Sequence, residues 1–205
     1  SREEEVKNGI EKVVSSTNLS FIETHLMTDD GWEEGMTGCK YVMHVAMPFI
    51  IAEPKDPDDI ILPTVEGTKR VLRFAKEAGV KRVVLTSTTL NVGHHNYSGL
   101  YDHKSWTDHK SNNISTYVRA KVLQELAAWE FINSQVGKTK LELTVLLLGG
   151  VFGPALTASG VSRDLIKQLI EGKQPMVPDL YTIMLDVRDS AIGHLKAMET
   201  KTAKK

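Results

Sequence analysis

The sequence has little of several features that would assign it to a specialised class of protein. A single cysteine, Cys39, among 205 residues excludes a disulfide within the chain and a site of clustered thiolates. The net charge of -1 provides no strong field to attract nucleic acid or an acidic membrane. Apolar runs such as residues 145–148 are far too short to span a bilayer. These absences predict a soluble, cytoplasmic protein without a nucleic-acid or membrane partner.

The first thirty residues are poor in glycine and in apolar runs. Gly9 is the only glycine before position 31, whereas a dinucleotide pyrophosphate is commonly seated by a glycine-rich turn at a helix amino terminus. Residues 1–14 lack the apolar core of a signal peptide. We therefore expect neither a glycine-rich phosphate loop nor an export signal in this chain.

Segments typical of strands and of helices alternate along the chain. Residues 40–49 and 81–87 are apolar and rich in β-branched side chains, and residues 141–154 resemble a buried strand that runs into a turn. Helical periodicity covers residues 59–78 and 116–134. This alternation predicts an α/β fold with a parallel sheet covered by helices on both faces. The other expected elements are a helix over 3–14, a strand over 19–26, a short helix after Thr28, a helix near 161–171, a strand near 181–186 and a helix near 188–199.

Polar residues follow the predicted strands where such sheets bind ligands, beyond the carboxyl ends. A cluster of hydroxyl side chains occupies residues 86–89. Tyr117 and Lys121 are four residues apart on one predicted helix, so they share a face and the ammonium can stabilise a phenolate. Such a tyrosine, with a lowered pKa, can transfer protons at neutral pH. An exposed helical pair without a catalytic role is the alternative interpretation.

Six segments carry a more specific pattern: DDGWEEGMTGCKYVMHVAMPF (29–49), PTVEGTKRVLRFAKEAGVKRVVLTSTT (63–89), WTD (106–108), STYVRAK (115–121), GGVFGP (149–154) and DVRDSAIGHLKAM (186–198). In this order they resemble the extended short-chain dehydrogenases/reductases, and within them the group similar to dihydroflavonol reductase and cinnamoyl-CoA reductase. The resemblance covers essentially the whole chain. It implies a Rossmann-type fold and the NAD(P)H-dependent reduction of an aldehyde or ketone to an alcohol, with NADP favoured over NAD.

The resemblance also implies roles for individual residues. Thr88 matches the catalytic Ser/Thr that donates to the substrate carbonyl, Tyr117 matches the general acid, and Lys121 matches the lysine that tunes the tyrosine and binds ribose. The implied cofactor contacts are Leu26, Val45, Ala46, Pro48, Ser87, Tyr117, Lys121, Leu148 and Val151, and the implied substrate contacts are Met47, Thr89 and Trp106.

The chain departs from the family pattern at three places. Leu148 stands where proline is usual, and His25 precedes Leu26 where an aspartate usually reaches the adenine. The third departure is the missing glycine-rich turn, which predicts that the chain starts after the second strand of the family's sheet. Residues 1–205 are therefore expected to form a single, incomplete Rossmann-like domain, with part of the substrate-binding lobe in about 155–185.

Two other functions remain open on these observations. A nucleotide-sugar epimerase or dehydratase shares the pairing of Tyr117 with Lys121 and the same hydride chemistry. An inactive fragment or binding module is the other, because the phosphate loop is missing. The expected partner is a small carbonyl compound, and a homo-oligomer is left open.

Remaining polar clusters are interpreted as structural. The loop 91–115 contains four histidines in a spacing that matches no set of metal ligands, so no metal site is expected. Cys39 lacks a neighbouring base and is interpreted as a small buried hydrophobic residue. Asp186 and Arg188 are expected to form an ion pair that ties a strand end to the start of a helix.

Overall fold

The structure, a computed structural model, describes residues 2–48, 53–93, 99–137, 139–156, 161–173 and 183–203. The chain separates into two compact units. The larger unit comprises Glu23–Leu148 and Ile192–Lys205, and the smaller unit comprises Ser1–Ile22 and Gly149–Ala191. The expectation of one incomplete domain stays a prediction.

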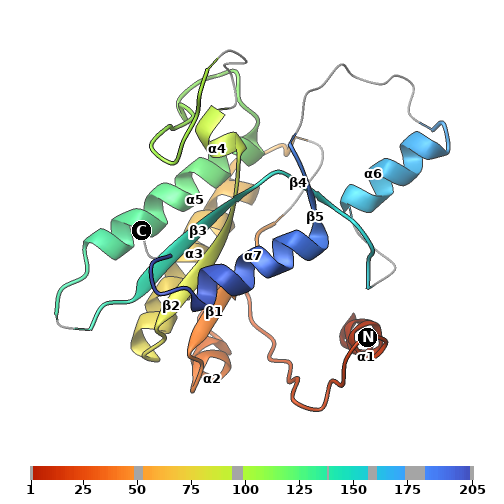
Figure 1. Ribbon diagram of the computed structural model, residues 1–205. Coiled ribbons are helices and arrows are strands. Elements are labelled where there is room, and N and C mark those ends of the chain that lie inside the picture. The colour runs from red at the N-terminus through yellow and green to blue at the C-terminus, as the bar shows by residue number, and fades with distance from the viewer. Residues whose placement is uncertain are drawn as a thin grey trace. The chain divides into compact units, whose positions relative to one another are not determined.

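The larger unit is built on a parallel sheet of three strands (Figure 1). The order is β1 (Tyr41–His44), β2 (Arg82–Thr88) and β3 (Glu142–Leu148). The register is fixed by pairs such as His44 with Leu85. Because all three strands run in the same direction, their carboxyl ends meet at one edge, which confirms the predicted parallel α/β arrangement.

Alternate residues of β2 face different helices, as the twofold period of a strand requires. Val83 and Leu85 are buried in the main apolar core with residues of two long helices, α3 (Asp58–Glu77) and α5 (Thr116–Asn133). Arg82 and Thr86 point the other way. The Arg82 guanidinium donates to backbone carbonyls in the last turn of the final helix, α7 (Val187–Glu199), and just beyond it. The Thr86 hydroxyl lies 2.8 Å from the His194 imidazole. The helices are α1 (Arg2–Glu11), α2 (Trp32–Met36), α3 (Asp58–Glu77), α4 (Leu90–Gly93), α5 (Thr116–Asn133), α6 (Val161–Ile170) and α7 (Val187–Glu199).

Helix α5, which carries the expected catalytic pair, has a defined start. Ser115 is extended and its hydroxyl accepts a hydrogen bond from the Val118 amide, which satisfies one free donor of the first turn. Such a cap contributes about 1 kcal/mol. The cap therefore stabilises the first helical turn, which contains Tyr117.

The smaller unit contains a second parallel pair of strands, β4 (Gly150–Phe152) and β5 (Met184–Asp186). Asp186 accepts hydrogen bonds from the backbone and the guanidinium of Arg188 at the start of α7. The predicted ion pair at this strand end is thus confirmed. The proposed substrate lobe at 155–185 is described only in part, because residues 157–160 and 174–182 lie outside the described residues.

The predicted strand over 19–26 is wrong. Residues 19–25 have no regular structure, and β1 pairs only with β2 in the described part of the chain. A lone extended segment has no neighbour to accept its backbone hydrogen bonds, so its β propensity is not sufficient. The first helix also ends earlier than expected, at Glu11, which leaves Val13 and Val14 exposed.

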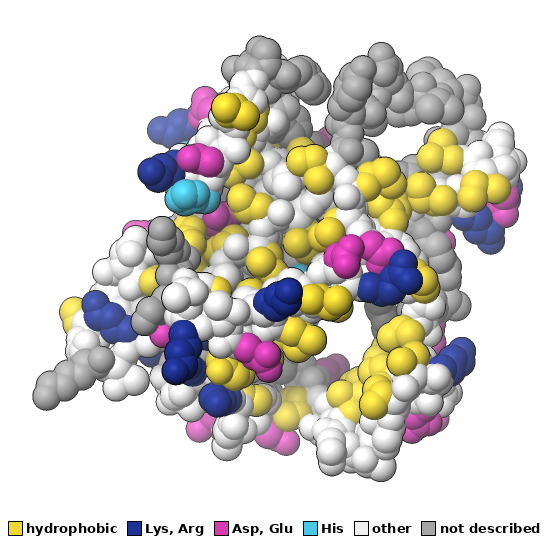
Figure 2. All heavy atoms as spheres, viewed as in Figure 1, with side chains coloured by type: hydrophobic (Ala, Val, Ile, Leu, Met, Phe, Trp, Pro, Cys, Tyr) yellow, Lys and Arg dark blue, Asp and Glu magenta, His cyan; other side chains and the backbone are white. Residues whose placement is uncertain are grey.

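The described helices include none that is both long and apolar enough to cross a membrane. Figure 2 shows acidic and basic side chains interspersed with apolar ones on the viewed face. That face therefore has no extended patch of a single charge sign.

Candidate active site

The hydroxyl cluster lies at the carboxyl edge of the sheet, at the end of its central strand. Ser87 and Thr88 are buried at the end of β2, and Thr89 directly follows the strand. The Thr89 amide donates to the Leu148 carbonyl, and Leu148 pairs with Thr88 in the sheet register. The structure therefore brings Ser87, Thr88, Thr89 and Leu148 together at one edge.

Lys121 reaches this edge from α5. Its side chain is 4% exposed, and its Nζ donates to the Thr86 carbonyl oxygen at 2.9 Å and to Gln124 Oε1 at 3.1 Å. Burial lowers the pKa of Lys121 to about 8, although the nearby Glu125 carboxylate acts to raise it. The amine is thus still mostly protonated at neutral pH.

Tyr117 lies one turn before Lys121 on the same helix. Its ring packs against Ile114, Val118 and Val122. Burial raises the pKa of Tyr117, which is opposite to the lowering expected from Lys121. Desolvation disfavours the phenolate. A tyrosine that stays protonated is suited to donate a proton rather than to remove one.

A second polar network lies behind the hydroxyl cluster and was missed by sequence reasoning. The Ser87 hydroxyl donates to Glu125 Oε2 at 2.8 Å, and Asn91 Nδ2 lies 2.8 Å from both Ser87 Oγ and Glu125 Oε2. Asn91 Oδ1 is buried without a hydrogen-bond partner among the described residues. The only available signal was the spacing of Lys121 and Glu125, which places both on one face of α5.

The segment that follows β1 is open to solvent. Val45 is 59% exposed, Ala46 is exposed, and Met47 and Pro48 are half-buried. These residues leave the same edge of the sheet as β2, so their backbone is accessible to a ligand lying across the strand ends. The residues expected to contact adenosine and substrate thus leave the sheet at the edge where β2 ends.

Two other expected contacts belong to other elements of the chain. Trp106 is 41% exposed in the loop before α5, where the Thr107 amide donates to the Asn91 carbonyl. Val151 belongs to β4 in the smaller unit, and its cofactor contact stays a prediction.

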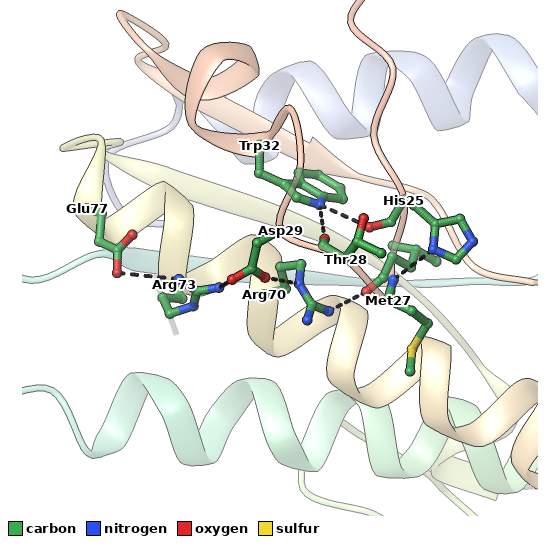
Figure 3. A network of polar contacts seen from close by, with 9 residues as sticks. His25, Met27, Thr28, Asp29, Trp32, Arg70, Arg73 and Glu77 are labelled. Carbon is green, nitrogen blue, oxygen red and sulfur yellow. Dashed lines mark hydrogen bonds and ion pairs between the residues drawn. The ribbon is translucent and has the colours of Figure 1, made fainter.

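The loop that carries Leu26 is tied to α3 by ion pairs (Figure 3). The Asp29 carboxylate bonds to both Arg70 and Arg73, and Arg70 also donates to the Leu26 carbonyl. These hydrogen bonds from the two arginines lower the pKa of Asp29. Leu26 packs directly over Gly67, where an added Cβ would come within 2.8 Å of a Leu26 methyl group. Leu26 therefore has a fixed position over the first half of α3.

Metal binding finds no support in the described part of the chain, where no group of three or more His, Cys, Asp or Glu side chains could hold an ion. Two of the four loop histidines, His94 and His95, lie outside the described residues. Cys39 is half-buried and packs against the main core, as its interpretation as a hydrophobic residue requires.

The donors present at the β2 edge fit a nicotinamide dinucleotide. Among the described residues, Lys121 directs two of its three N–H groups at protein acceptors, so a third N–H can bind a ribose hydroxyl. Tyr117 supplies a phenol one turn away, and the open backbone at 45–48 continues the same edge. The edge therefore combines a cation, a proton donor and an accessible strand end.

The chain matches a described protein family over its whole length. Residues 1–205 match the NAD dependent epimerase/dehydratase family. The chain is 29% identical over 181 residues to the NADPH-dependent methylglyoxal reductase GRE2 of Saccharomyces cerevisiae, covering 79% of the chain and 53% of that protein. It is 30% identical over 213 residues to anthocyanidin reductase of Arabidopsis thaliana, covering 95% of the chain and 61% of that protein. The chain thus spans about half the length of the curated relatives it matches.

Solved structures share the fold. The crystal structure of yeast methylglyoxal/isovaleraldehyde reductase Gre2 complexed with NADPH superposes with a TM-score of 0.76 at 27% identity, covering 88% of this chain and 59% of that one. Vestitone reductase from alfalfa has a TM-score of 0.76 at 22% identity, covering 93% and 60%, and shows the fold alone. The expected Rossmann-type architecture is therefore confirmed.

Proposed function

The chain belongs to the NAD dependent epimerase/dehydratase family, and on this premise we propose that it is the catalytic part of an NAD(P)H-dependent carbonyl reductase. The substrate class is a small aldehyde or ketone, which is reduced to an alcohol. The reaction is thus an oxidoreduction at a CH–OH group, run in the direction of the alcohol. NADPH is the favoured cofactor, since similar proteins are named as NADPH-dependent or were crystallised with NADPH.

The observation that carries this proposal is the placement of Lys121. Its ammonium is fixed at the carboxyl end of β2 by the Thr86 carbonyl and lies on the same helix as Tyr117, one turn away, while Ser87 and Thr88 directly follow Thr86 in the strand. A proton donor, a cation and a hydroxyl donor are thereby anchored on two neighbouring elements that pack together. This is the set of groups that carbonyl reduction requires from a protein.

Each group has a distinct part in the proposed mechanism. When bound, the reduced dinucleotide supplies the hydride that is added to the carbonyl carbon. Thr88 orients the carbonyl oxygen by donating a hydrogen bond, and Tyr117 gives its phenolic proton to that oxygen. Lys121 stabilises the phenolate that Tyr117 leaves, and its remaining N–H holds the ribose. The alcohol leaves with one hydride and one proton added.

The test compares Tyr117→Phe with Tyr101→Phe, which removes a hydroxyl from a more exposed tyrosine in the preceding loop. NADPH oxidation is followed by absorbance with methylglyoxal and isovaleraldehyde as substrates. Tyr117→Phe should reduce kcat by at least about a hundredfold, the range of a general acid, whereas Tyr101→Phe should retain activity. Equal rates for Tyr117→Phe and the unmodified chain would refute the proposal.

The same assay separates the alternatives. A nucleotide-sugar epimerase or dehydratase would turn over its substrate without net consumption of cofactor. An inactive fragment or binding module would show no rise in thermal stability with NADPH, because only a ligand of the folded state stabilises it. Light scattering after gel filtration distinguishes a monomer from a homo-oligomer, and the cytoplasmic location stays a prediction.

A further inference from the structure

A line of buried polar side chains leads from Lys121 into the interior of the larger unit. Lys121 donates to Gln124 Oε1 at 3.1 Å, Gln124 Nε2 donates to Thr68 Oγ1 at 2.8 Å, and His44 Nε2 lies 2.9 Å from the same Thr68 oxygen. The four side chains come from α5, α3 and β1, and none of the four residues is more than 5% exposed. We call these four residues the buried polar chain.

Each hydrogen bond of the buried polar chain has one assignable donor, and the chain converges on Thr68 from both ends. The Thr68 hydroxyl donates to the Thr64 carbonyl at 2.8 Å, so its oxygen accepts from both Gln124 and His44. His44 is therefore a donor at Nε2. The amide of Gln124 has both ends occupied, because its nitrogen donates to Thr68 and its oxygen accepts from Lys121. No rotation of the amide would satisfy these neighbours equally well.

The charged groups around this line are few. From α5, Glu125 is the acidic group that acts on Lys121, and its carboxylate is already engaged by Ser87 and Asn91. From β1, His44 is neutral, because burial and then the Lys121 charge lower its pKa to about 4. The β2 group that contacts Lys121 is the uncharged Thr86 carbonyl, and the α3 group that contacts Gln124 is the uncharged Thr68 hydroxyl. Gln124 thus gives the ammonium an oriented but uncharged acceptor.

We propose that Gln124 is a positioning residue for Lys121, which fixes the direction of the ammonium and keeps its direct acceptors uncharged. The catalytic meaning of this role rests on the proposed function, but the role itself concerns only the amine. With two N–H groups directed at the Thr86 carbonyl and Gln124, the third N–H is confined to one remaining direction. An acceptor with a negative charge at this position would instead favour the protonated form of the amine.

The experiment measures the amine directly in the unliganded chain. The Nζ signals of lysine labelled with 15N are followed by NMR across alkaline pH, and the Lys121 signal is assigned by its loss in Lys121→Met. In the unmodified chain, Lys121 should titrate with a pKa of about 8, below the ordinary value for lysine. Gln124→Glu should raise its pKa by about 1–3 units, and Gln124→Met, which removes the acceptor, should lower it. Gln124→Met decides the question alone if Gln124→Glu fails to fold.

The control is Leu126→Glu, which adds a carboxylate to an exposed position of the same helix. It should shift the Lys121 titration by less than about 0.5 units, because the new charge is solvated and does not contact the amine. A Lys121 titration that is unchanged in both Gln124 variants would overturn the proposal. A shift in Leu126→Glu as large as that in Gln124→Glu would also overturn it, since a general field would then suffice.

Activity is a separate readout. If the chain reduces carbonyl compounds, Gln124→Glu should move the alkaline limb of the pH profile of kcat upward with the lysine pKa. If Tyr117→Phe and the unmodified chain prove equally inactive, the proposed function fails, yet the lysine titration still decides the role of Gln124. The two failures are therefore distinguishable.

Discussion

The buried imidazole of His44 makes a quantitative prediction about stability at acidic pH. Burial and the Lys121 charge lower its pKa from 6.5 to about 4 in the folded chain. In the unfolded chain the imidazole binds a proton below about pH 6.5, whereas the folded chain does not until about pH 4. The unfolded state therefore takes up more protons between these values, and stability falls as the pH falls. Between pH 7 and pH 5 the loss from this one group is about 2 kcal/mol.

The perturbation that isolates this effect is His44→Gln. A glutamine side chain can still donate to Thr68 Oγ1 but does not titrate. Any change in the free energy of unfolding that the substitution itself causes is therefore the same at every pH. Urea unfolding followed by tryptophan fluorescence at pH 7 and pH 5 gives the free energy of unfolding for both chains. The unmodified chain should lose about 2 kcal/mol more than His44→Gln over this interval. Equal losses would show that His44 is protonated in the fold and would refute the reasoning.

Three further predictions concern packing and ion pairs, each checked by urea unfolding. Arg82→Met should cost about 3–5 kcal/mol, since it removes the buried guanidinium that donates to the Ala197 carbonyl and pairs with the partly buried Glu142 carboxylate. Gly67→Ala should destabilise by about 1 kcal/mol net, because the clash with Leu26 exceeds the gain in helix propensity. Gly193→Ala, with no atom near the new methyl group, should be neutral or stabilising. Asp29→Asn should cost less than Arg82→Met, and its effect should shrink at high salt because Asp29 is exposed. A Gly67→Ala chain that is no less stable than the unmodified chain, or a Gly193→Ala chain that loses as much stability as Gly67→Ala, would contradict the packing argument.

The sequence was sufficient to predict the elements whose signal is local. The periodicity over 59–78 and 116–134 corresponds to α3 and α5, and the run 81–87 corresponds to β2 within one residue. The predicted strand over 19–26 failed because strand formation depends on a neighbouring strand, which no local pattern supplies. Loops that are held by ion pairs, as residues 25–29 are, cannot be distinguished from strands by hydrophobicity alone.

Residues of the candidate site could be predicted only where they belong to a recognisable local motif. Tyr117 and Lys121 were found from their spacing, and their strand-end partners from the order of elements. Gln124 and Thr68 were missed because their significance is tertiary: they contact each other across 56 residues. A signal did exist for Thr68, which lies among the apolar positions of its helix, where an unpaired hydroxyl would be costly. Which partner satisfies it could be decided only by the packing of α3 against α5.

Arg82 has a consequence for the order of events in folding. Its guanidinium joins the start of β2 to carbonyls 115, 116 and 118 residues later in the chain. Closing so large a loop is entropically costly, so this contact is expected to form after the sheet and its nearer helices. Arg82→Met should then accelerate unfolding and leave the refolding rate nearly unchanged, which stopped-flow kinetics can measure. The Arg82 contact would thus determine the unfolding rate of the larger unit, and so the lifetime of its folded state, rather than its folding rate.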